Sequence, residues 1–218
     1  MSAENGSPKG ATRLAVIADP LGRAAEAYRT LSVNIRFGRF EQPAQTILFT
    51  SATADDDSST TVANVAVAAA QANASVVVVD ADLRRPGLHE IFGIANTTGL
   101  TTLSDGMTDV PTQPTAIERL RVITSGPPTA SPAELLSSER LLLLLARLRT
   151  EADLVLVAAA PVTVAADASL LAVRVDGVVL VVDAQRTRRQ DARRARAQLD
   201  RVNARILGVV LSNASDTE

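Results

Sequence analysis

Short apolar runs rich in valine and leucine recur along the chain, with longer stretches of helical spacing between them. The runs are apolar on both faces, a pattern typical of strands buried between two layers of helices. The predicted strands are residues 46–50, 75–80, 120–125, 153–158, 177–183 and 206–212. Their alternation with helices predicts an α/β fold with a doubly wound, mainly parallel sheet.

A first helix is predicted at 24–40, where Ala27, Leu31, Ile35 and Phe37 recur at roughly helical spacing. The other predicted helices are 59–74, 138–150 and 186–202, with shorter ones at 100–103, 132–137 and 167–173. No internal repeat and no linker long enough to separate two domains is visible. We therefore expect a disordered leader at 1–12, a single folded domain at 13–213 and a short tail at 214–218.

The composition narrows the chemistry of this 218-residue chain. It has no cysteine and a single histidine, His89, which excludes disulfides, thiolate nucleophiles and multi-histidine metal sites. Aromatic residues make up 2% and the net charge is −2, so nucleic acid is a poor partner overall. Of the 22 basic residues 21 are arginine, and the lone lysine, Lys9, lies in the leader. The predicted folded domain therefore contains no lysine that could take part in chemistry.

No apolar run approaches the roughly 18 residues of a membrane span, and residues 1–12 lack the apolar segment of a signal peptide. We expect a cytoplasmic chain that a partner would bring to the inner face of the membrane. Ligands of such sheets bind beyond the carboxyl ends of the strands. The loops after Thr50, Asp80 and Ala158 are therefore where chemistry is expected.

A series of motifs runs along residues 24–213: AEAYRTL, the frame TSAT…STT, VVVVDADLRRP with GLHEIFG, SGPPTASPAELLSSERL, and GVVLVV with ILGVVL. In these motifs the chain resembles the bacterial tyrosine kinases of capsular and exopolysaccharide synthesis, which are related to the ParA/MinD-type ATPases. The resemblance implies a P-loop fold and, in an active member, ATP-dependent phosphorylation of protein tyrosine.

The first loop departs from the family pattern. Where a member carries Pro-Gly-Glu-Gly-Lys-Ser-Thr, residues 54–60 read ADDDSST, so Asp55 and Asp57 replace both glycines and Ser58 replaces the lysine. Family glycines let backbone N–H groups converge on phosphate, and the lysine bridges the β- and γ-phosphates. Only Ser59 and Thr60 remain of the residues that would hold Mg²⁺ and phosphate.

These changes weaken triphosphate binding by a large factor. A like-charge contact at about 4 Å costs roughly 1 kcal/mol in water and roughly 4 kcal/mol at an effective dielectric of about 20. Loss of the lysine's charge-assisted hydrogen bond removes roughly another 1.5–3 kcal/mol. Together they imply at least a roughly hundred-fold loss of affinity. The flanking arginines Arg39 and Arg84 are distant in sequence, which does not show whether either folds back.

Three interpretations of this loop remain open. Asp55 to Ser58 directly precede a helix, where carboxylates and hydroxyls cap free N–H groups, and this is the favoured interpretation. A divalent-cation cluster with Asp80 and Asp82 is the second, and residual nucleotide binding is the third. No cofactor is therefore expected, and ATP with Mg²⁺ would bind only if the altered loop is still competent.

The second loop keeps the family's acidic motif, whereas the third loop lacks the aspartate that the family has there. By resemblance, Asp80 and Asp82 would be the catalytic and metal-binding carboxylates of an active enzyme. The structural alternative, which we favour, is that Asp80 caps the strand end while Asp82 pairs with Arg84 or Arg85. In the third loop Ala158 replaces the aspartate that would hold the Mg²⁺ shell. Near the end, Ser212 replaces the family's usual asparagine, although the neighbouring Asn213 could serve.

The first helix resembles the family's oligomerisation element, Glu-x-x-Arg-x-x-Arg. Glu26 and Arg29 match it, Ser32 stands at the third place, and Arg36 lies one turn further on, so a homo-oligomer and a solvated face are equal alternatives. The family phosphorylates a tyrosine-rich tail on a neighbouring subunit. Here the end reads SNASDTE and the only tyrosine is Tyr28, which we interpret as a packing residue with its hydroxyl at the surface.

The segment 186–202 carries seven arginines and a narrow apolar stripe formed by Ala192, Ala195, Leu199 and Val202. A solvated outer face is the favoured interpretation, with an anionic membrane or partner next and DNA last. His89 is placed at a helix start after Pro86, without a partner that indicates catalysis.

The pattern as a whole predicts a non-catalytic relative, a pseudokinase, that acts by protein contact in the synthesis, chain-length control or export of surface polysaccharide. Its partner would be a membrane polysaccharide co-polymerase or an active tyrosine kinase homologue. Two alternatives are an active ATP-dependent kinase with an altered P-loop and a ParA-like DNA-binding module.

Overall fold

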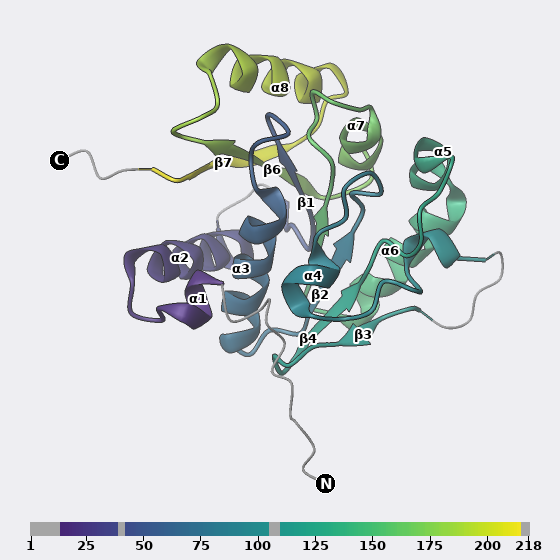
Figure 1. Cartoon of the computed structure of the whole chain (residues 1–218), viewed down its shortest axis with the longest axis horizontal. Coiled ribbons are helices and arrows are strands. Elements are labelled where there is room, and N and C mark those ends of the chain that lie inside the picture. Colours follow the sequence, from purple (N-terminus) through teal and green to yellow (C-terminus); the bar gives the residue numbers. More distant parts are fainter. Residues whose placement is uncertain (1–13, 39–41, 105–109, 215–218) are drawn as a thin grey trace, which may run out of the picture.

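The computed structural model describes residues 14–38, 42–104 and 110–214, and within them the chain forms one seven-stranded sheet (Figure 1). Its order is β3-β4-β2-β5-β1-β6-β7. The strands are β1 (Thr46–Ser51), β2 (Val76–Asp80), β3 (Gln113–Pro114), β4 (Leu120–Ile123), β5 (Leu154–Ala158), β6 (Gly177–Asp183) and β7 (Ile206–Ser212). All pairings are parallel except that of β3 with β4. The predicted doubly wound, mainly parallel sheet is confirmed.

Helices cover both faces of the sheet. The helices are α1 (Ala15–Ala18), α2 (Arg23–Phe37), α3 (Ser58–Gln71), α4 (Leu88–Phe92), α5 (Pro132–Ser137), α6 (Glu139–Glu151), α7 (Asp167–Ala172) and α8 (Arg189–Arg201), with a 3₁₀ turn at Leu100–Thr102. Helices α1 to α4 pack on one face, and α5 to α8 pack on the other. The predicted leader, and all of the predicted tail except residue 214, lie outside the described residues.

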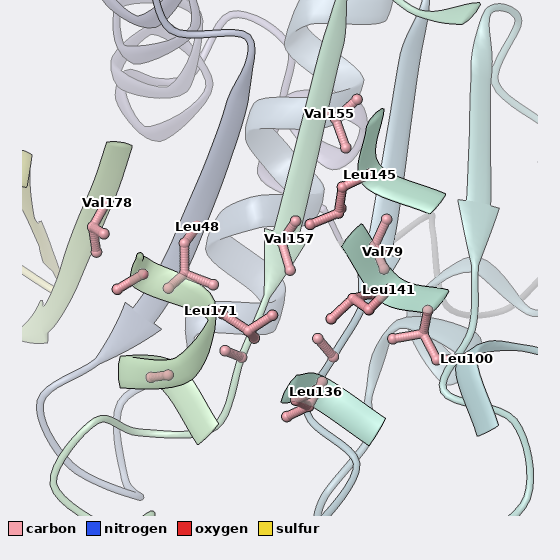
Figure 2. Packing of buried hydrophobic residues seen from close by; sticks show 14 of the residues in the cluster. Leu48, Val79, Leu100, Leu136, Leu141, Leu145, Val155, Val157, Leu171 and Val178 are labelled. Atoms are coloured by element: carbon pink, nitrogen blue, oxygen red, sulfur yellow. The ribbon is translucent and has the colours of Figure 1, made fainter. Parts of the chain in front are cut away.

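Alternate strand residues supply the two cores. In β1, Leu48 points into the core beneath α5, α6 and α7, whereas Ile47 and Phe49 point into the core beneath α3. Figure 2 shows the first of these cores, where Leu48 and Val157 approach Leu171 of α7. Every residue of the four central strands is buried, so no polar position within them is left free for chemistry except at their ends.

Local hydrogen bonds explain where helix boundaries differ from the prediction. Helix α8 starts at Arg189 rather than at residue 186. The Asp183 side chain accepts bonds from the backbone N–H groups of Gln185 and Arg186, and its carbonyl accepts one from Thr187. These bonds fold residues 183–187 into a turn, which delays the helix. The apolar pattern did not separate α1 and the two-residue strand β3, because each is too short for a period to appear.

Candidate functional site

Four loops meet at the carboxyl edge of the sheet. Strands β2, β5, β1 and β6 are consecutive neighbours, so the loops that follow them at 81–87, 159–166, 52–57 and 184–188 lie side by side. This is the edge at which open α/β sheets bind ligands. Three of these loops were selected from the sequence, and the fourth was not.

Asp56 ties the first loop to the end of β6. Its buried carboxylate accepts a bond from the Thr53 N–H at 2.7 Å within the loop, and its other oxygen accepts one from the Asp183 N–H at 2.8 Å. The Thr187 hydroxyl donates to that same oxygen. A carboxylate of the chain itself therefore occupies backbone and hydroxyl donors at the centre of the candidate site.

The next residues cap α3. Asp57 is the N-cap residue, and its side chain accepts a bond from the Thr60 N–H at 2.8 Å. The Asp57 carbonyl accepts bonds from the Thr61 N–H and hydroxyl. Ser58, buried, is the first residue of the helix, and Ser59 lies beside Gly87 of the second loop. The predicted capping role is found at Asp57, whereas Asp56 points away from the helix.

Asp80 is buried at the end of β2 with one oxygen bonded and one not. Its Oδ2 accepts bonds from the Gly87 and Leu88 N–H groups at the start of α4, at 3.1 and 3.0 Å. Its Oδ1 is buried with no partner among the described residues. Burial raises the pKa of this carboxyl to about 7, with the negative charge of Asp82 adding to the effect and the backbone N–H groups of Leu88, Gly87 and Asp82 opposing it.

Asp82 pairs with Arg84 and Arg85 as expected, but through the backbone and not through the guanidinium groups. It accepts bonds from their N–H groups at 3.1 and 2.9 Å, which close the loop as an Asx-type turn. Burial raises the pKa of Asp82, and these bonds oppose the rise. The two guanidinium groups are used elsewhere.

Both arginines of the second loop cross to neighbouring elements. Arg84 makes a two-pronged pair with the buried Asp167 of α7, with Nε–Oδ2 at 2.7 Å and Nη2–Oδ1 at 3.2 Å. Arg85 reaches back to the first loop, where its Nη2 donates to the Ala54 carbonyl at 2.8 Å. An arginine therefore does fold back onto the altered loop, but it is Arg85 and not Arg84, and Arg39 lies outside the described residues.

The third loop offers no carboxylate to this site. Ala158 ends β5 in register with Asp80 and is buried, so a longer acidic side chain is missing directly beside that group. The loop is fixed to the first one by two hydroxyl groups. Thr50 donates to the Ala160 carbonyl and Thr163 donates to the Ala52 carbonyl, at 2.8 and 2.6 Å.

The end of β7 contributes through Asn213 rather than Ser212. The Asn213 amide donates to Asp183 Oδ2 at 2.8 Å, and this bond is the main reason that the pKa of Asp183 lies below its usual range. The Ser212 hydroxyl lies 3.5 Å from the Val182 carbonyl. The Asn213 amide is thus bonded to an internal carboxylate.

Helix α2 carries the predicted interface residues. Glu26 and Arg29 form an exposed i,i+3 pair at 3.5 Å, an arrangement compatible with both the interface and the solvated-face alternatives. Arg36 donates to the Ala72 carbonyl and stacks over the exposed Phe37 ring, 4.8 Å from its centre. Ser32 is buried, so the third place of the element faces inward.

Tyr28 packs against the α3 core as predicted. Its hydroxyl, however, is directed at α3 rather than at open solvent. Burial raises the pKa of the hydroxyl, a hydrogen bond with the Thr61 side chain lowers it, and the Asp57 charge raises it. The single tyrosine therefore lies next to the first loop.

His89 lies one residue after the start of α4, in agreement with its predicted place. Its Nε2 is 3.9 Å from the exposed Glu90 carboxylate, and its Nδ1 is buried with no partner within the described ranges.

Asp183, Thr187 and Asp167 complete the polar network and were missed from the sequence. Asp183 ends a valine-rich run in the same way as Asp80, and that shared strand-end position could have marked it. Thr187 and Asp167 carry no local signal, because only the meeting of β6, α7 and the two loops gives them partners.

The described residues contain no group of three or more histidine and acidic side chains placed to hold a metal ion. Nor, over the ranges the structure describes, is any helix long and apolar enough to cross a bilayer.

The fold and loop positions define a P-loop NTPase-type domain. The structure superposes with a TM-score of 0.65 on the septum site-determining protein MinD from Pyrococcus horikoshii, over 79% of this chain and 72% of that one, at 20% identity, which shows the fold alone. No protein-family model matches the chain.

Sequence relatives decide the family. The chain is 35% identical over 196 residues to tyrosine-protein kinase YwqD of Bacillus subtilis, covering 89% of this chain and 83% of that protein. It superposes at a TM-score of 0.88 on the chimerical protein CapA2B2, with 32% identity over 93% of this chain and 90% of that one. The kinase domain of the Escherichia coli tyrosine kinase ETK gives 0.86, with 25% identity over 100% of this chain and 88% of that one. This chain belongs to the bacterial tyrosine-protein kinases.

Proposed function

We propose that this chain is a non-catalytic member of the bacterial tyrosine-protein kinases and acts by protein contact in exopolysaccharide or capsule synthesis, chain-length control or export. One observation carries the proposal. In the loop that would hold phosphate, Asp56 occupies the donors of Thr53, Asp183 and Thr187, while Asp57 occupies the N–H of Thr60. The chain's own carboxylates thus occupy two backbone N–H groups of this loop and helix start, those of Thr53 and Thr60, and tie the loop to the end of β6.

The residues present do not fit Mg²⁺ with a nucleoside triphosphate. The loop from 54 to 60 carries three aspartates and no lysine, and a phosphate entering it would meet like charge. The nearby guanidinium of Arg85 is bonded to the Ala54 carbonyl and has the negative Asp82 close by. Ala158 offers no oxygen beside Asp80. Charge and donor arrangement both favour a contact protein over a phosphotransferase.

The partner that fits this role is a membrane polysaccharide co-polymerase or an active tyrosine kinase homologue. The family membership supports the process, and the exposed pair Glu26–Arg29 with Arg36 on α2 supports a surface for self-assembly or for contact with a homologue.

A calorimetric titration with Mg·ATP tests the proposal. The native chain should give no binding heat at millimolar nucleotide, and no phosphate should appear on Tyr28 or on a supplied tyrosine peptide. The matched variant rebuilds the family loop through Asp55→Gly, Asp57→Gly and Ser58→Lys, and a second adds Ala158→Asp. Binding by the rebuilt variants alone supports loss of function at this loop. Binding or turnover by the native chain contradicts the proposal and restores the active-kinase alternative.

The DNA-binding alternative is tested separately, by retardation of duplex DNA at low salt. A backbone-driven complex would show a steep salt dependence. Retardation that is lost when the α8 arginines are replaced would favour that function over the one proposed.

A further inference from the structure

Among the residues that the structure describes, strand β7 is left open along its outer edge. It is the last strand in the sheet order, and β6 is its one partner within those residues (Figure 1). The Ser212 carbonyl accepts a bond from the Ala184 N–H, which places the backbone groups of Ser212 on the β6 side. Since backbone groups of successive strand residues point to opposite edges, the N–H and C=O groups of Val209 and Leu211 point outward. An edge of this kind is a template for another strand.

The same two residues form an apolar shelf next to α8. Val209 and Leu211 are 56% and 59% exposed, although they lie in register with the buried Leu180 and Val182 of β6. Helix α8 covers β6 through Ala195 and Leu199. On β7 Ile206 packs against the same core, whereas Val209 and Leu211 remain exposed. Between α8 and β7 runs a groove of about 470 Å³ with an apolar floor.

Arginines of α8 form the opposite wall of the groove. Arg193 and Arg196 both line it. Arg196 is 3.6 Å from Asp200 in an exposed pair, and Arg193 makes no ion pair with any residue that the structure describes. Residues 186–201 hold seven arginines against two aspartates, a local charge of +5 in a chain whose net charge is −2. The groove is thus apolar below and basic above.

We propose that the groove and edge of β7 bind an extended, acidic and apolar segment of a partner protein, which adds to the sheet as an eighth strand. Main-chain hydrogen bonds to Val209 and Leu211 give such a complex its register, and side-chain pockets give it specificity. Apolar side chains of the segment cover the shelf, and its carboxylates face Arg193 and Arg196. The proposal specifies the contact surface of the protein-contact function proposed above and rests on it.

Charge and shape favour this occupant over the others. A second copy paired antiparallel at β7 would place two α8 helices on the same face of a joined sheet, and their arginines would repel each other. A DNA backbone or an anionic bilayer surface would satisfy the arginines, but neither supplies strand-type hydrogen bonds to the open edge. Only an extended peptide uses the edge, the shelf and the charge together.

The test measures binding of two capped, fluorescent peptides by polarisation. One repeats Val-Val-Glu-Glu, which puts both residue types on each face of a strand, and the matched control repeats Val-Val-Lys-Lys. The native chain should bind the acidic peptide at least tenfold more tightly than the basic one, with an affinity that falls as salt rises. Equal binding of the two peptides, or none, would show the proposal to be wrong.

Two variants separate strand addition from plain charge attraction. Leu211→Pro removes an outward N–H without touching the ladder to β6, a position at which edge strands tolerate proline, and Leu211→Val is its matched control. The proline variant and the charge reversal R193E/R196E should each lower the affinity for the acidic peptide at least tenfold, while Leu211→Val should change that affinity less than twofold. Circular dichroism and thermal melting check that all variants fold.

Three outcomes would overturn the proposal. If the proline variant bound the acidic peptide as tightly as the native chain, the arginines would be a general anion-binding patch and not part of a strand-addition site. Concentration-dependent dimers of the native chain that the proline variant abolishes would assign the edge to a second copy. Anionic vesicles or duplex DNA that bind the native and proline variants equally and displace the peptide would assign the arginines to those surfaces. Because no nucleotide is present, failure here leaves the Mg·ATP result untouched, and the reverse also holds.

Discussion

The carboxylate of Asp56 accepts a hydrogen bond from the backbone N–H of Asp183 at 2.8 Å, and so connects residues that are 127 positions apart in the sequence. Asp56 belongs to the loop after β1, and Asp183 is the last residue of β6. Together with the Thr187 hydroxyl, they lock two neighbouring loops of the carboxyl edge to each other. An internal anion thereby joins the loop after β1 to the loop after β6.

Replacing Asp56 should destabilise the whole domain. Asp56→Ala leaves the N–H groups of Thr53 and Asp183 and the Thr187 hydroxyl without their acceptor. A buried donor left unpaired costs about 1–3 kcal/mol, so we expect the free energy of unfolding to fall by about 2–3 kcal/mol in urea denaturation. The control is Asp55→Ala, an exposed neighbour that should change it by less than about 0.5 kcal/mol. Equal effects of the two changes would refute the locking role.

The α3 cap gives a smaller and more local prediction. Asp57→Ala removes the acceptor for the Thr60 N–H and should lower the free energy of unfolding by about 1 kcal/mol. Asp57→Ser, which keeps a capping oxygen, should recover most of that loss. The Asp57→Gly change within the rebuilt loop carries a smaller penalty of roughly a few tenths of a kcal/mol, so stability must be measured beside nucleotide binding in that variant.

Asp80 makes stability depend on pH. Its carboxyl ionises near 3.8 in an unfolded chain and near 7 in the folded one, so the unfolded state loses its proton first as pH rises. The free energy of unfolding should therefore fall between about pH 4 and pH 7 through this group. Asp80→Asn removes the group, and thermal melts should show it more stabilised relative to the native chain at pH 8 than at pH 5.

A native chain and an Asp80→Asn variant whose melting temperatures differ by the same amount at pH 5 and pH 8 would contradict this. The control is Asp153→Asn, because Asp153 lies in the loop before β5 and bonds to the exposed Ser75 N–H. Its effect should not follow the window set by Asp80.

The pair of Arg84 with Asp167 fixes the second loop to α7. Arg84→Ala leaves the buried Asp167 carboxylate without its partner. Because the arginine side chain is 45% exposed, water can screen part of the loss, and we expect a destabilisation of about 1–2 kcal/mol. Arg84→Lys keeps the charge but not the two-pronged geometry, and its free energy of unfolding should lie between those of the native chain and Arg84→Ala. A double-mutant cycle with Asp167→Ala measures the coupling, and a value near zero would exclude the pair as a restraint.

Much of the fold could be predicted from the sequence, because the buried strands have a clear local pattern. Runs such as 177–183 and 206–212 are apolar and β-branched, and the structure places strands over the same residues. The loop departures at Asp55, Asp57, Ser58 and Ala158 were visible because the resemblance to the bacterial tyrosine kinases aligns these positions with the family's motifs. Hydrogen-bond partners could not be predicted. The sequence did not show that backbone N–H groups would hold Asp82, or that Asp56 would bond to Asp183 and not cap α3.

The sequence by itself determined the α/β class, the family resemblance and the absence of a lysine from the loop that follows β1. These depend on local periodicity and on residue identity, which need no knowledge of distant contacts. Only the tertiary structure decided that Asp56 turns to Asp183, that Arg85 rather than Arg84 returns to the first loop, and that part of β7 is left exposed beside the α8 arginines. Each of these depends on which strand ends become neighbours, and strand order is a property of the folded chain as a whole.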